Sequence, residues 1–148
     1  MLTTPTVTAG SGGYVPQPYF MQLTFDAQTG TGTSADAPNA TRNNSNRIFA
    51  CDRLGFATLA TGSNNSRSVF GFKLFKTTES SSLTQDFIEV NSITSYANPI
   101  IDLPIPYLIG INESITGSNI LRAFGAQIDG TTALTSDTLR ITLFGILQ

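Results

Sequence analysis

The sequence predicts an all-β protein, and three observations lead to this prediction. Charged residues make up only 12% of the chain, so the Glu- and Lys-rich composition of a helical bundle is missing. Thr, Ser, Asn and Gly are abundant instead, and these residues favour pleated strands and the turns between them. Several segments alternate apolar and polar residues, which is typical of a strand with one buried face.

The clearest of these segments is the last one, residues 137–148. Apolar and polar residues alternate from Leu139 to Leu143. Phe144 then interrupts the polar face and Gly145 follows it, which predicts a β-bulge. Because frayed chain ends are normally polar, we expect this apolar segment to be a central strand of a sheet.

Three earlier segments have the same character. We predict a strand at Tyr19–Asp26, one or two strands at 47–60, and another at 68–77. Their candidate core residues are Tyr19, Met21, Leu23, Phe25, Ile48, Phe49, Cys51, Leu54, Phe56, Leu59, Phe70, Phe72 and Leu74.

Two segments fit both helix and strand. In residues 82–91, Ser82 and Gln85 resemble a helix capping box, but the following residues alternate. We therefore predict one helical turn that leads into a strand at 87–93. Segment 118–128 suits a short helix or a strand, and the Asp-Gly turn signal after it favours the strand.

Polar and proline-rich segments separate these elements. Residues 27–46 are predicted to form a long polar loop, and residues 61–66 a turn. Residues 98–111 are apolar but contain three prolines, which predicts an edge strand or a polyproline-like run. This segment either covers the core or offers a contact surface to another subunit.

Residues 1–18 carry no charge and contain three prolines and three glycines. Such a segment is either a floppy tail or an arm that lies across a neighbouring subunit. The arm would be anchored by Val7, Tyr14 and Val15. We therefore divide the chain into an extended N-terminal arm, 1–18, and a single β-sandwich domain, 19–148.

The residues available for chemistry are few. Without histidine, Ser-His-Asp and Cys-His nucleophiles and His-ligated metal sites are excluded. Cys51, the single cysteine, is expected to be a small buried hydrophobe. Carboxylates near strand ends, at Asp52, Asp102, Glu113 and Asp129, leave general acid–base chemistry as the remaining route. We predict no enzyme activity, no cofactor and no metal site.

Basic residues do not indicate a nucleic-acid site. A cluster in the sequence at Arg42, Arg47, Arg53 and Arg67 forms either a binding patch or a solvated face with local ion pairs. The net charge of −2 and the scarcity of interleaved aromatics favour ion pairs. Asn-x-Ser/Thr motifs, the acceptor sites for N-glycosylation, occur at Asn39, Asn43, Asn64 and Asn112. Because we expect no secretory signal, we attribute them to the abundance of Asn, Ser and Thr.

About eight short strands with long polar loops predict a two-sheet antiparallel sandwich, with a jelly roll as the first choice. From Phe20 to Leu147 this layout resembles the small single-jelly-roll proteins of non-enveloped or tailless viruses, including minor capsid and vertex proteins. The resemblance implies a structural role in the virion, after synthesis in the host cytoplasm. The partners would be copies of the chain itself or other capsid proteins, with no nucleic acid bound directly.

The subunit contacts that we propose from the sequence are Val7, Tyr14, Val15, Ile105, Tyr107 and Leu108. We expect no transmembrane segment, because the richest apolar run, 105–111, is too short to cross a bilayer. An alternative function is a glycan- or receptor-binding module, such as a phage fibre head or a lectin-like adhesin. It would use the loops at 27–46 and 61–66.

Overall fold

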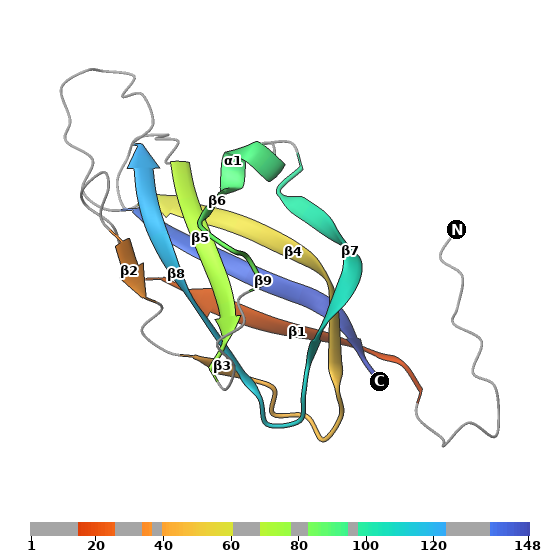
Figure 1. Cartoon of the computed structure of the whole chain (residues 1–148). Coiled ribbons are helices and arrows are strands. Elements are labelled where there is room, and N and C mark those ends of the chain that lie inside the picture. Colours follow the sequence, from red (N-terminus) through yellow and green to blue (C-terminus); the bar gives the residue numbers. More distant parts are fainter. Residues whose placement is uncertain are drawn as a thin grey trace.

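The protein is a sandwich of two antiparallel β-sheets, seen in a computed structural model (Figure 1). The structure describes residues 15–25, 34–36, 40–60, 69–77, 83–94, 98–123 and 137–148. Within these ranges the single helix is α1 (Val90–Ile93), which is one turn long. The predicted all-β, two-sheet architecture is confirmed.

The first sheet, called sheet A, contains the longest strands. Its order is β1 (Gln17–Thr24), β9 (Asp137–Leu147), β4 (Phe49–Ala60) and β7 (Ile100–Ile109). Strand β9 pairs with β1 on one side and with β4 on the other (Figure 1). The prediction that the last segment is a central strand is confirmed. Of the two alternatives predicted for 98–111, the structure has the edge strand, β7.

The second sheet, sheet B, has shorter strands. Its order is β2 (Ser34–Asp36), β8 (Ser114–Ala123), β5 (Val69–Lys76) and β6 (Ile88–Glu89). Strand β3 (Thr41–Arg42) also pairs with β8, closer to the start of β8 than β2 does. The predicted strand at 118–128 is confirmed as far as residue 123, and residues 124–128 lie outside the described part of the chain.

Two local predictions were wrong. The loop predicted at 27–46 contains β2 and β3, which pair with β8 through main-chain hydrogen bonds that need no apolar side chains. The order predicted for 82–93 is reversed, because the two-residue strand β6 comes first and α1 follows it. The Val90 carbonyl accepts bonds from both the amide (2.9 Å) and the hydroxyl (2.8 Å) of Thr94, which closes the helical turn after the strand.

The core lies between the sheets and is rich in phenylalanine. Most of the predicted core residues are buried; the largest of them are Phe25, Phe49, Phe70 and Phe72. The rings of Phe56 in β4 and Phe72 in β5 lie 5.0 Å apart, so they join the two sheets directly. The placement of Ile48 in the core was wrong: it precedes β4 and is 43% exposed. The side chain of Leu59 is outside the described set.

The predicted bulge lies in β4 and not beside Gly145 in β9. Cys51 pairs with Gly145 and Arg53 pairs with Phe144, so Asp52 is an extra residue in β4. The β1–β9 pairing continues through Gly145 without interruption. A side chain at Gly145 would lie 2.8 Å from the Cα of Cys51 and closer still to the carbonyl oxygen of Ala50. The glycine therefore permits the close approach of the bulged strand.

Leu143→Asp is expected to abolish folding. Leu143 is fully buried and lies opposite Leu54 and Met21 in the sheet register, so a carboxylate there would have no partner. Circular dichroism of the purified variant measures the loss of structure. Thr142→Asp, on the outward face of the same strand, should fold. A soluble, cooperatively folded Leu143→Asp protein would show that the core is wrongly assigned.

Candidate subunit-contact surface

The outward face of sheet A carries a patch of apolar side chains. We call the following five residues the outer patch: Phe20, Ile100, Leu108, Phe144 and Ile146. Phe20 is 60% exposed and Leu108 is 50% exposed, while Phe144 and Ile146 are half-buried. In a free-standing antiparallel sheet the outward face is normally polar. An apolar outward face therefore makes this side of the molecule a candidate contact surface.

The register makes the patch continuous across the sheet. Ile146 lies between Pro18 on β1 and Ala50 on β4, and Ala50 lies beside Leu108 on β7. Two residues further along β1, Phe20 lies beside Phe144 of β9. Neighbouring side chains on one face of an antiparallel sheet are close enough to touch. The apolar band thus crosses all four strands of sheet A.

Phe144 is the centre of the patch. Its ring meets that of Phe20 edge to face, with 5.5 Å between the centroids, and the Arg53 guanidinium lies 5.9 Å from its centroid. The ring also occupies the space above Gly55, where an added Cβ would come within 2.6 Å of it. A glycine in β4 therefore lets Phe144 lie across the sheet.

Charges of both signs lie at the margin of the outer patch. Arg53 Nε is 3.2 Å from Asp52 Oδ1, and Asp102 is the register partner of Arg53 on β7. Adjacent residues of a regular strand point to opposite faces, so the bulge is what brings the Asp52 and Arg53 side chains together. Because both groups are about half exposed, this ion pair contributes little to stability.

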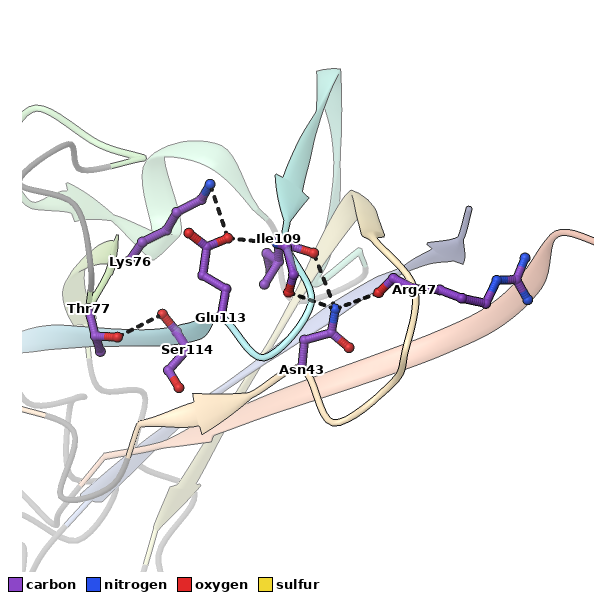
Figure 2. Close-up of polar contacts among 8 residues, drawn as sticks. Asn43, Arg47, Lys76, Thr77, Ile109, Glu113 and Ser114 are labelled. Carbon is purple, nitrogen blue, oxygen red and sulfur yellow. Dashed lines mark hydrogen bonds and ion pairs between the residues drawn. The ribbon is translucent and has the colours of Figure 1, made fainter. Parts of the chain in front are cut away.

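A buried polar cluster closes one end of the sandwich (Figure 2). At its centre the fully buried Asn43 donates from Nδ2 to three carbonyl oxygens, those of Arg47 (2.9 Å), Ile109 (3.2 Å) and Gly110 (3.0 Å). Asn43 Oδ1 accepts from the amide (3.0 Å) and hydroxyl (2.6 Å) of Ser45. These partners fix the orientation of the amide group.

The cluster holds the ends of several strands in place. Arg47 Nη2 donates to the carbonyls of Val15 (2.7 Å) and Leu147 (3.0 Å). Glu113 Oε2 accepts from the Gly110 amide (2.6 Å) and lies 3.3 Å from Lys76 Nζ (Figure 2). The start of β1, the end of β7 and the end of β5 are thereby tied together.

The contacts proposed from the sequence have different surroundings. Val15, Ile105 and Leu108 are exposed, by 54%, 79% and 50%. Tyr107 is partly buried against the core, and Lys76 Nζ lies 5.4 Å from its ring centroid. Leu108 belongs to the outer patch and Ile105 does not. Val7 and Tyr14 lie outside the described residues.

Four patch residues were missed in the sequence: Phe20, Ile100, Phe144 and Ile146. Each occupies the face of its strand that alternation assigns to solvent. The signal that was available is Phe144, which interrupts the polar face of the last strand. Read together with Phe20, an aromatic residue at the outward position of the first strand, it points to an outward apolar surface.

The candidate chemical groups lie in two places: Cys51, Asp52 and Asp102 are around the β4 bulge, and Glu113 is in the polar cluster. Burial raises the pKa of the Cys51 thiol to about 12, and its Sγ donates to the Arg53 carbonyl at 3.4 Å. The expectation of a buried hydrophobe is confirmed. Asp52 pairs with Arg53, whereas Glu113 belongs to the polar cluster. Asp129 is outside the described ranges, and within those ranges no group of three or more His, Cys, Asp or Glu is placed to hold a metal.

The arginines and the Asn-x-Ser/Thr motifs are also dispersed. Arg42 lies on β3, Arg47 in the polar cluster and Arg53 on the outward face of sheet A; Arg67 is outside the described residues. Asn43 is fully buried, so the folded protein cannot carry a glycan there. Asn112 is exposed in the β7–β8 turn, with φ of 62°. Asn39 and Asn64 fall outside the described ranges.

The chain matched no protein-family model, no curated protein and no solved structure. None of the helices in the described part is long and apolar enough to cross a membrane.

Asn43→Asp is expected to destabilise the fold by about 3 kcal/mol at neutral pH. The carboxylate has no hydrogen to donate, and its charge would face three carbonyl oxygens. Burial and these acceptors raise the pKa of the new carboxyl above the ordinary value of about 3.9. The folded state then binds the proton more tightly than the unfolded state does. The loss of stability relative to the parent protein therefore develops as pH rises through this raised pKa.

Urea unfolding of the parent and Asn43→Asp proteins, from a pH of about 3.9 to neutral pH, measures this loss of stability. Asn44→Asp is the matched control, because Asn44 is the exposed neighbour, and its stability should follow that of the parent protein. Equal stability of the Asn43→Asp and Asn44→Asp variants at neutral pH would contradict the role given to the buried amide.

Proposed function

We propose that this chain is a structural subunit of a virion, a capsid or minor capsid protein at a vertex or elsewhere in the shell. It acts by packing against copies of itself or other capsid proteins. The observation that carries the proposal is the order in which the strands pair. The apolar outward face of sheet A adds the surface through which subunits would join.

The strand order supports a jelly roll. Counting β2 and β3 as one interrupted strand, since both pair with β8, the described residues form eight strands. The first pairs with the last (β1–β9), the second with the seventh (β2/β3–β8), the third with the sixth (β4–β7) and the fourth with the fifth (β5–β6). This nested pairing, folded over into two sheets, is the pattern expected of a jelly roll, an architecture that occurs in capsid and lectin domains.

The outer patch favours an oligomer over a monomer. Three of its side chains, Phe20, Leu108 and Ile100, are 42–60% exposed, and each would be taken out of water by a neighbouring subunit. The net charge of −2 offers little electrostatic resistance to self-association. Charges of both signs at the margin, on Arg53 and Asp102, suit a contact between like or unlike subunits.

A double substitution, Phe20→Glu with Leu108→Glu, is expected to convert an assembling protein into a monomer. Both side chains point outward, so the fold should be unchanged while two charges make burial of the patch prohibitive. Light scattering and sedimentation give the mass of each protein in solution. Ile111→Glu is the control, because Ile111 is 53% exposed in the β7–β8 turn and outside the patch.

Deletion of residues 1–14 tests the arm. The truncation ends there, and not at residue 18, because β1 begins at Gln17 and Val15 is held by Arg47. We expect the deletion to spare the fold, as judged by circular dichroism, and to reduce the assembled mass. A parent chain that stays monomeric at high concentration, alone and with the other shell proteins, and that binds glycans would favour the recognition module instead.

A further inference from the structure

An apolar cavity of about 330 Å³ opens at one side of the sandwich, between the edge of sheet A and the connection that carries β6 and α1. Strand β7 contributes Ile101, Leu103 and Ile105 to its wall, and Phe72 of β5 and Ile93 of α1 line it from the other side. Figure 1 shows β7 and α1 at the same side of the molecule. The cavity is distinct from the outer patch, which faces away from sheet B.

The cavity exists because two strands separate. Pairing between β4 and β7 stops after Cys51–Tyr107 and resumes at Arg53–Asp102, so four residues of β7 stand opposite the single residue Asp52. The unpaired segment contains two prolines, which have no amide hydrogen to donate to β4. On the opposite side β6 is only two residues long, so sheet B does not cover the gap.

The lining determines what the cavity can accept. Among its ten residues, Thr84 alone has a polar side chain and none has an ionisable one. A charged ligand would lose its hydration without gaining a partner, whereas an apolar ligand would exchange water for carbon contacts. A cavity of about 150 Å³ holds one benzene molecule, so this one has room for about ten carbon atoms.

We propose that this cavity is a binding site for a small uncharged apolar ligand, such as a medium-length hydrocarbon chain or alcohol. Leu103 and Ile105, on the unpaired part of β7, form the wall at which the ligand enters. Ile105 is 79% exposed, so its side chain forms the rim of the opening. The site does not overlap the outer patch, because no residue of that patch lines it.

Titration of the full chain with 1-aminonaphthalene, an uncharged ten-carbon probe whose fluorescence changes in apolar surroundings, tests the site. We expect saturable binding of one probe per chain, and stronger displacement of the probe by decanol than by decanoate. Leu103→Trp fills part of the cavity and should weaken probe binding more than about tenfold, since each methylene-sized group of the probe that stays in water lowers the affinity about fourfold.

Ile105→Glu places a charge at the rim without touching the core, and it should weaken binding by a similar factor. Ile111→Glu adds the same charge to an exposed site elsewhere, and it should bind the probe as the parent protein does. Circular dichroism checks that each variant is folded. Absence of saturable binding, or equal affinity of the parent, Leu103→Trp and Ile105→Glu proteins, would overturn the proposal, as would displacement of the probe by decanoate alone.

Discussion

The extra residue in β4 determines how this strand pairs with both of its neighbours in sheet A, β9 and β7. Asp52 shifts the register of β4 against β9 and against β7 at the same point. On the β9 side, the shift presses the β4 backbone against Gly145, where a Cβ would not fit. On the β7 side, it coincides with the segment that leaves the sheet and opens the cavity. The same extra residue thus lies where β4 approaches β9 closely and where β7 separates from β4 to open the cavity.

The two faces of sheet A serve different purposes although the same strands supply them. Inward residues such as Leu139, Ile141 and Leu143 are fully buried and pack between the sheets. Outward residues of the same strand, Phe144 and Ile146, remain half-exposed. Burial of the inward side chains does not depend on what covers the outward ones, so the core of the sandwich forms within the single chain.

Sequence patterns identified the elements that burial determines. A strand with one buried face must alternate, and so the strands containing Leu23, Phe72 and Leu143 could be predicted. The strands β2 and β3 could not, because main-chain hydrogen bonds to β8 define them without apolar residues. The outer patch was only partly predicted, since alternation assigns Phe20 to solvent and cannot show that Phe144 lies beside it. The prolines of β7 account for its interrupted pairing with β4, but the local sequence does not show which residues from other strands would line the resulting cavity.

The polar cluster around Asn43 joins several strand ends at one end of the sandwich through hydrogen bonds. Buried main-chain carbonyls at Ile109 and Gly110 would be costly without donors, and the amide of Asn43 supplies them. Leu108 directly precedes these carbonyls, and Val15 is bonded to Arg47 in the same cluster. The backbone at or next to two exposed apolar residues is therefore held by a buried network, and a surface whose backbone is ordered in advance would lose less conformational entropy on binding a partner.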